Sequence, residues 1–196
     1  NVRYSNAIWK GEALIDEVRL GIYEKNPPNV FTKESFDQKP QGWTFTNAVI
    51  DNSKARLTGT GNSWATRLQG PFVSSQSNPH YSIDFTNLTL DSVLHVMIEG
   101  QAQDNTYRRF CIYQGGGKLN VQVVDKNGWS YPYSIAYTQG KSYTVDYDYT
   151  PTAIYLYVYE KGTEKPLNPT YILNNPDWTN VRYSNAIWKG EALIDE

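Results

Sequence analysis

Polar and aromatic side chains recur at every second position in three successive stretches near the middle of the chain. In Val93–Gln101, Thr106–Gln114 and Leu119–Val124 they alternate with apolar residues, so a β-strand places them together on one face. Flat aromatic rings cover the apolar C–H faces of sugars, while amides, guanidinium groups and carboxylates hydrogen-bond the hydroxyls. The pattern therefore favours an exposed sugar-binding face. Its candidate residues are His95, Glu99, Gln101, Tyr107, Arg109, Asn120, Gln122 and Trp129.

A simpler explanation of this alternation stays open. An antiparallel sheet with one face in water alternates in the same way whatever it binds, and tyrosine is common on β-sheet surfaces. A second stripe, Tyr155, Tyr157 and Tyr159, has the same spacing. It could pack between domains as readily as against a sugar.

Catalytic motifs are weak. Glycoside hydrolysis needs two carboxylates that flank the scissile bond. The nearest cluster is Glu191, Asp195 and Glu196, and adjacent residues of a strand point to opposite faces. Gly115–Lys118 resembles a phosphate loop only superficially, because Leu119 follows the lysine and the stretch joins two predicted strands. We therefore expect a protein that is not an enzyme.

Composition narrows the range of partners. The 196 residues carry a formal net charge of −2, and 39% are hydrophobic, which is typical of one folded domain. Arg108 and Arg109 form the only basic cluster, so neither nucleic acid nor an anionic membrane is an expected partner. No stretch approaches the roughly 18 apolar residues of a membrane span. Cys111 is the single cysteine, which excludes an internal disulfide.

Runs rich in Tyr, Val, Ile and Thr, separated by Gly, Pro, Asn and Asp, predict an all-β chain. Gly115–Gly117 and Asp125–Gly128 have the glycine and Asn-Gly pairs of tight hairpins, and Asn26–Asn29 reads as a linker. The predicted strands are Ala13–Tyr23, Trp43–Ile50, Ala55–Thr58, Ser63–Leu68, Tyr81–Leu88, Val93–Gln101, Thr106–Gln114, Leu119–Val124, Ser142–Tyr149 and Ala153–Tyr159.

Several of these runs resemble known domains. Gly140–Tyr149 followed by Ile154–Gly162 is similar to a hairpin of laminin-G-like and concanavalin A-like jelly rolls, and Ala13–Gly21 resembles their final strand. Phe36–Trp43 resembles the region of their first strand. The resemblance implies an antiparallel β-sandwich of the jelly-roll type, and lectin-like members often bind glycans on the concave face.

The resemblance also implies a possible calcium site, because calcium often stabilises such domains and is coordinated by carboxylate, amide and backbone carbonyl oxygens. Oxygen donors occur at Asp51–Asn52, at Asp104–Asn105 and at Asp146 with Asp148, but none has the spacing of a calcium motif. We expect no other cofactor, and a structural calcium ion stays an open expectation.

Residues 1–17 recur without change as residues 180–196, an offset of 179 residues. Such a copy predicts a tandem repeat; a duplicated overlap from cloning or circular permutation is the alternative. As a repeat, the chain divides into residues 1–25 from a preceding unit, a linker at 26–30, and a sandwich at 31–196 whose last strand is missing at the C-terminus. The chain is then permuted relative to its fold, and Ala13–Glu24 completes either its own sheet or a neighbour's by strand exchange. The candidate assembly residues are Trp9, Ile15, Val18, Leu20, Ile22 and Trp188.

These observations lead to one preferred function and one alternative. The preferred function is a non-catalytic, lectin-like repeat unit of an extracellular or cell-surface fibre, stalk or adhesin, joined head-to-tail through the duplicated segment. The alternative is a carbohydrate-binding module of a polysaccharide-degrading enzyme. The expected partners are copies of the same domain and polysaccharide.

Overall fold

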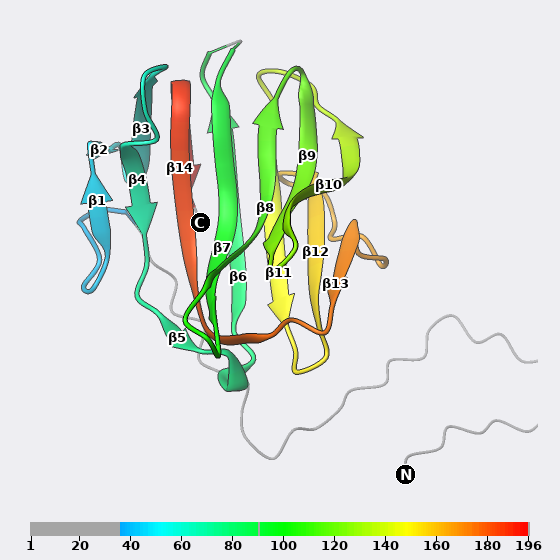
Figure 1. The fold of residues 1–196 in the computed structure, drawn as a ribbon. Helices are drawn as coiled ribbons and strands as arrows, with labels where there is room; N and C mark the ends of the chain where they lie inside the picture. Colours follow the sequence, from blue (N-terminus) through cyan, green and yellow to red (C-terminus); the bar gives the residue numbers. More distant parts are fainter. Residues whose placement is uncertain (1–35, 90, 196) are drawn as a thin grey trace, which may run out of the picture. The chain divides into compact units, whose positions relative to one another are not determined.

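The structure, a computed structural model, describes residues 36–89 and 91–195, and these form an all-β domain (Figure 1). Every strand pairing is antiparallel. The strands are β1 (Thr44–Thr46), β2 (Ala48–Asp51), β3 (Lys54–Thr60), β4 (Thr66–Gln69), β5 (Val73–Ser74), β6 (His80–Asn87), β7 (Val93–Ala102), β8 (Tyr107–Gly115), β9 (Lys118–Asp125), β10 (Gly128–Ala136), β11 (Ser142–Tyr149), β12 (Ala153–Glu160), β13 (Tyr171–Asn174) and β14 (Trp178–Asp195), with a 3₁₀ turn at Ser75–Ser77.

The strands form two layers that share β14. We call the layer β10-β9-β8-β7-β14-β4-β1 the front sheet and the layer β13-β12-β11-β6-β14-β3-β2 the back sheet (Figure 1). Up to Lys189, β14 pairs with β7, and from Ala192 it pairs with β6. The predicted antiparallel β-sandwich is confirmed.

Strand β14 crosses from one layer to the other at Gly190, whose φ of +84° is the left-handed conformation that favours glycine. Both edges of β14 are paired, with β7 and β6 on one side and with β5, β4 and β3 on the other. Its residues Val181, Ile187, Ala192 and Ile194 are buried in the core. The C-terminal copy of the duplicated segment is therefore a central strand of this domain.

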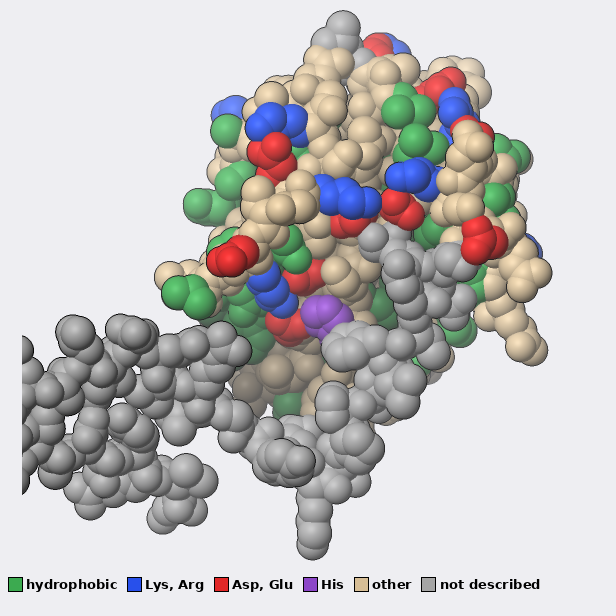
Figure 2. Space-filling view, turned by 180° about the vertical axis from the view of Figure 1, so that it is seen from behind, with side chains coloured by type: hydrophobic (Ala, Val, Ile, Leu, Met, Phe, Trp, Pro, Cys, Tyr) green, Lys and Arg blue, Asp and Glu red, His purple; other side chains and the backbone are tan. Residues whose placement is uncertain are grey.

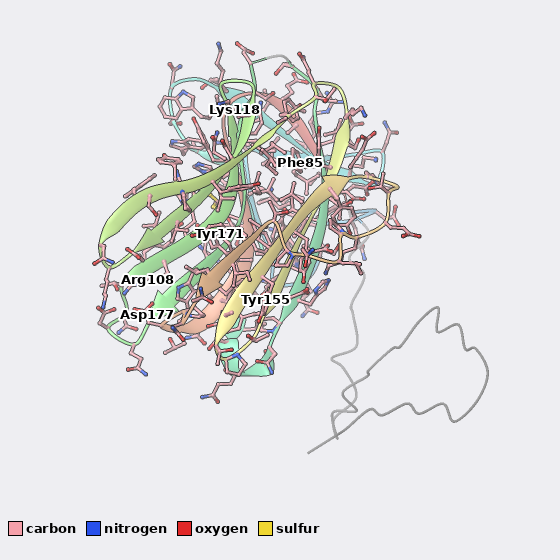
Figure 3. All side chains as sticks on the ribbon, turned by 90° about the vertical axis from the view of Figure 1, so that its right-hand side faces the viewer. Phe85, Arg108, Lys118, Tyr155, Tyr171 and Asp177 are labelled. Atoms are coloured by element: carbon pink, nitrogen blue, oxygen red, sulfur yellow. The ribbon has the colours of Figure 1, made fainter. Side chains whose placement is uncertain are left out.

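Apolar side chains from the two sheets fill the space between the layers. Tyr147 of the back sheet is fully buried and joins them, because its hydroxyl donates to the carbonyl of Val96 at 2.7 Å and accepts from the amide of Ile112 at 3.2 Å. Phe85 and Tyr171 lie between the layers (Figure 3). The centroid of the Tyr171 ring is 6.0 Å from that of the Phe110 ring. These contacts hold the front sheet against the back sheet, and they therefore fix the position of its outer face.

Of the nine strands predicted between Trp43 and Tyr159, eight are present, and both hairpins are confirmed: Gly115 pairs with Lys118, and Asp125 pairs with Gly128. Trp43–Ile50 is wrong as a single strand. Asn47, with a positive φ of 54°, divides it into β1, which pairs in the front sheet, and β2, which pairs in the back sheet. The predicted strand Ala13–Tyr23 lies outside the described residues.

Four strands were not predicted, and one of them, β5, has only two residues. Strand β10 contains Pro132 and a register shift between Ser130 and Tyr133, both typical of an edge strand. Strand β13 is the short edge strand at the other end of the strand order, opposite β10. Strand β14 is the central strand that both layers share. Within the described part of the chain, no helix has the length and hydrophobicity needed to cross a membrane.

Candidate functional site

The outer face of the front sheet, which we call the front face, carries three rows of side chains that run across its strands. Residues directly opposite each other in an antiparallel pair share a face, so the strand register defines each row. The rows are Arg182, Glu99, Arg109, Val124 and Trp129; Gln69, Ser184, Met97, Cys111 and Gln122; and Arg67, Ala186, His95, Tyr113 and Asn120. The register thus brings together residues of β4, β14, β7, β8, β9 and β10.

Glu99 is the hydrogen-bonded centre of the first row and is 2% exposed. Its Oε2 accepts from Nε of Arg182 at 2.8 Å, from Nη2 of Arg182 at 2.7 Å and from Nε2 of Gln69 at 3.1 Å. Its Oε1 accepts from the Tyr107 hydroxyl at 3.0 Å. Burial and then the Glu99 charge raise the pKa of Tyr107, so this hydroxyl stays protonated and donates. Both oxygens of the carboxylate are therefore engaged.

Arg109 lies opposite Glu99 in the register but is not hydrogen-bonded to it. The residue is 7% exposed, and its Nε and Nη2 atoms have no hydrogen-bond partner. The ring of Trp129 lies over its guanidinium group, 4.5 Å from the ring centroid, and Trp129 itself is 64% exposed. A buried cation thus lies beneath an open aromatic ring.

His95, in the third row, is buried between two aromatic rings. Trp64 is stacked on it at 4.3 Å, and the Tyr113 ring lies 5.0 Å away. Burial, and then the charges of Arg109 and Arg67, lower the pKa of His95 to about 3. The imidazole is therefore neutral at pH 7, and its Nε2 has no hydrogen-bond partner.

The middle row combines polar and inert groups. Gln122 donates from Nε2 to the Tyr131 hydroxyl at 2.7 Å and accepts from Sγ of Cys111 at 3.5 Å. Burial raises the pKa of the Cys111 thiol to about 12, so it is not a reactive thiolate at neutral pH. The buried hydroxyl of Ser184 has no hydrogen-bond partner.

The strand register agrees with the face of the sheet predicted for the eight candidate sugar-binding residues. Their predicted exposure to solvent is wrong for four of them. His95, Glu99, Arg109 and Gln122 are buried because neighbouring rings and Arg182 cover them. The other four remain accessible: Gln101 and Asn120 are half-buried, and Tyr107 and Trp129 are exposed.

Sequence reasoning missed residues of β4, β14 and the segment between β4 and β5. Arg182 and Gln69 hold Glu99, and Arg182 also lies over the ring of Phe72 at 4.5 Å. Nothing in the local pattern links position 182 to position 99. Phe72, Tyr107, Trp129 and Tyr131 are the exposed aromatic rings of the front face, which we call the aromatic rim.

The outer face of the back sheet is dominated by paired charges, and Figure 2 shows Lys and Arg interspersed with Asp and Glu there. Lys161 bridges Asp84 at 2.8 Å and Asp195 at 3.1 Å. Lys165 bridges Asp146 at 3.1 Å and Asp148 at 3.0 Å. The tyrosine stripe predicted at 155, 157 and 159 lies on this same face, opposite Asp148, Asp146 and Thr144 in the register.

The carboxylates considered for calcium have partners within the chain. Asp51 pairs with Arg56, Asp104 accepts hydrogen bonds from Thr106, and Lys165 pairs with the two aspartates of β11. Among residues 36–89 and 91–195, no group of three or more His, Cys, Asp or Glu is arranged to hold a metal ion. Structural calcium stays a prediction.

The assembly candidates are described only in part. Trp188 packs beside Trp64, with ring centroids 5.6 Å apart, and is half-buried. The remaining candidates, Trp9, Ile15, Val18, Leu20 and Ile22, lie outside the described residues.

Comparison with known proteins identifies the fold. No protein-family model and no curated protein matches the sequence. Among solved structures, a native glycosidic hydrolase is similar with a TM-score of 0.56 and 14% identity, over 83% of this chain and 91% of the other. The carbohydrate-binding module CBM66 from Bacillus subtilis matches with a TM-score of 0.54 and 9% identity, over 79% and 92% of the two chains. Lectin I-B4 from Griffonia simplicifolia matches with a TM-score of 0.51 and 12% identity, over 82% and 93%.

The domain is a concanavalin A-like, lectin-like jelly roll. The predicted resemblance is confirmed at the level of the fold. Proteins named as a hydrolase, a binding module and a lectin share this fold, so the fold by itself does not decide between catalysis and binding.

Proposed function

We propose that this domain binds carbohydrate on its front face. The observation that carries the proposal is a set of buried polar atoms without partners: Nε and Nη2 of Arg109, Nε2 of His95 and Oγ of Ser184. Buried polar groups are nearly always hydrogen-bonded, and one left unpaired costs about 1–3 kcal/mol. Arg109 is the nearest of these groups to solvent, because only the exposed Trp129 ring covers it, and a sugar hydroxyl or other acceptor completes its donors when that ring moves aside.

The aromatic rim supplies the apolar half of the site. Trp129 lies over the unpaired guanidinium group of Arg109, and Tyr131 accepts a hydrogen bond from Gln122 of the middle row. Rings of this kind pack on the C–H faces of sugars while neighbouring polar groups fix the orientation of the ligand. The likeness in fold to a carbohydrate-binding module and to a lectin supports the same function.

The state of Glu99 favours binding over hydrolysis. Hydrolysis of a glycosidic bond uses two carboxyl groups, one of which must reach the leaving group. Glu99 is the one carboxylate in the three rows, and its oxygens are occupied by Arg182, Gln69 and Tyr107. Glu99 thus organises the face rather than acting on a ligand.

Replacing Trp129 with alanine is expected to weaken polysaccharide binding about two- to tenfold, because stacking against an aromatic ring contributes about 0.5–1.5 kcal/mol. The matched control is Tyr133→Ala. Tyr133 lies on the same strand and is 48% exposed, but it pairs with Val121, whose side chain faces the core. Isothermal titration with soluble polysaccharides, acidic and neutral, measures both. Equal affinity for the two variants would remove Trp129 from the site.

We propose as a second function that the domain is a repeat unit of an extracellular fibre, stalk or adhesin, and one specific observation favours it. The C-terminal copy of the duplicated segment is paired on both edges as the central strand β14. One domain has a single such position, so the N-terminal copy, identical in sequence, suits the equivalent position of another unit. Units then join head-to-tail when residues 1–17 of one chain take the β14 position of the next unit in place of that unit's own C-terminal copy.

Removing residues 1–25 is expected to abolish concentration-dependent oligomers of the chain, as seen by light scattering and negative-stain electron microscopy. Substitutions in the N-terminal copy sharpen the test. Ile8 is the copy of buried Ile187, and Lys10 is the copy of exposed Lys189. Ile8→Asp should prevent association and Lys10→Asp should leave it intact. A monodisperse full-length chain at every concentration would rule out assembly through this segment.

A further inference from the structure

Three arginines of this domain hold carboxylates with the same edge of the guanidinium group. Arg108 donates from Nε and Nη2 to the two oxygens of Asp177 at 3.0 and 2.8 Å, and the two side chains lie together in Figure 3. Arg182 uses Nε and Nη2 toward Glu99, at 2.8 and 2.7 Å. Arg56 uses the same two atoms toward Asp51. In all three arginines the edge formed by Nε and Nη2 thus holds a carboxylate, and Arg56 holds a second one, that of Glu191, through Nη1 at 3.2 Å.

Arg109 presents this same edge without a partner. Its Nε and Nη2 atoms are buried and unbonded beneath the Trp129 ring, which is itself 64% exposed, so a ligand reaches this edge when that ring moves aside. Arginine stays protonated in proteins, and a buried charge is normally paired. The group that best completes this edge is a carboxylate, which accepts two parallel N–H donors.

The charges of the front face also favour an anion. Its rows hold the cations Arg67, Arg109 and Arg182 against the single anion Glu99, while His95 is neutral because burial lowers its pKa. The chain as a whole has a net charge of −2. A locally positive face on an acidic protein attracts an anionic ligand selectively.

We infer that the front face recognises an acidic saccharide, with a sugar carboxylate bound to the Nε–Nη2 edge of Arg109 and the sugar ring against the aromatic rim. This inference rests on the proposed carbohydrate-binding function and names its ligand class, a polysaccharide containing uronic acid. The sugar carboxylate accepts hydrogen bonds from the buried guanidinium group of Arg109. The exposed rings of Trp129 and Tyr107 favour a sugar over a simple anion, because they offer an apolar surface for the sugar ring.

The test compares an acidic and a neutral polymer of matched backbone on the full chain. Isothermal titration with oligomers of galacturonate and of galactose is expected to show about tenfold or tighter binding of the acid, the range for a hydrogen bond to a charged group. Arg109→Gln should abolish this preference. Arg109→Lys should reduce it, because lysine keeps the charge but lacks the two-donor edge. Lys141→Gln, which removes an exposed cation outside the three rows, should leave it unchanged.

The ¹⁵N signal of the Arg109 Nε–H group gives a second readout that needs no variant, and galacturonate oligomers should shift it more than galactose oligomers do. Equal affinity for the two polymers would overturn the inference while leaving carbohydrate binding intact. Failure to bind either polymer would overturn both. A poly-aspartate peptide or inorganic phosphate that bound as tightly as the galacturonate oligomer would exclude a saccharide-specific site.

Discussion

Replacing Arg182 with methionine is expected to destabilise the folded domain by about 3 kcal/mol. Arg182 is the cation that pairs with Glu99, through two nitrogens at 2.8 and 2.7 Å, and Glu99 is 2% exposed. Removing one partner of a buried ion pair leaves a desolvated charge without compensation, which costs more than the pair itself contributes. Urea unfolding monitored by tryptophan fluorescence measures the loss.

A double-mutant cycle isolates the cause. In Glu99→Gln the charge is absent, so adding Arg182→Met to that background should cost less, by about 1 kcal/mol or more, than it does in the natural sequence. Arg67→Met is the matched control, because Arg67 lies on the same face and hydrogen-bonds the carbonyl of Trp64 at 3.0 Å. We expect it to cost about 1 kcal/mol or less. Additive effects of the Arg182 and Glu99 substitutions would contradict the pairing.

The contrast between Glu99 and Arg109 separates the groups that stabilise the front face from those that the proposed binding function would use. Glu99 is satisfied by Arg182, Gln69 and Tyr107, whereas the donors of Arg109 have no partner in the chain. Groups whose partners belong to the protein hold the strands in register, and groups whose partners are missing are available to a ligand. The two classes are neighbours in one row, with Arg109 directly opposite Glu99, so a change in either is expected to affect the other.

The sequence predicted the faces of the central strands but not their burial. A period of two assigns Glu99 and Arg109 to the face opposite Ile98 and Phe110, because successive side chains of any strand alternate. Their burial depends on partners remote in the chain: Arg182 is 83 residues from Glu99. No local pattern encodes such a contact, so a single sequence does not show which polar residues are covered.

Strand β14 was missed for a related reason. Its inner face carries Val181, Tyr183 and Ile187, but Asn185 interrupts this alternation although it is fully buried. The Asn185 amide donates to the carbonyl of His95 at 3.3 Å and its oxygen accepts from the Tyr183 hydroxyl, so the core satisfies both ends of this polar group. Hydrophobic periodicity treats such a residue as a break in the strand.

Replacing Gly190, the one glycine of β14, with alanine is expected to cost about 2–5 kcal/mol of folding free energy. At a φ of +84° a side chain is strained by about 1–2 kcal/mol. The added Cβ would also lie 2.8 Å from Cα of Ser92 and against the hydroxyls of Thr89 and Ser92, an overpacking that costs about 1–3 kcal/mol.

Gly116 separates these two causes. Its φ of +62° is also left-handed, but nothing lies within 4 Å of a Cβ added there, so Gly116→Ala should show the backbone strain alone, about 1–2 kcal/mol. Urea unfolding of both variants gives the difference. A larger loss at Gly190 means that the close approach of the Thr89–Ser92 turn, as well as the backbone conformation, requires glycine where β14 crosses between the sheets. Equal losses would mean that the turn yields to a methyl group and that the crossing of β14 depends on backbone conformation alone.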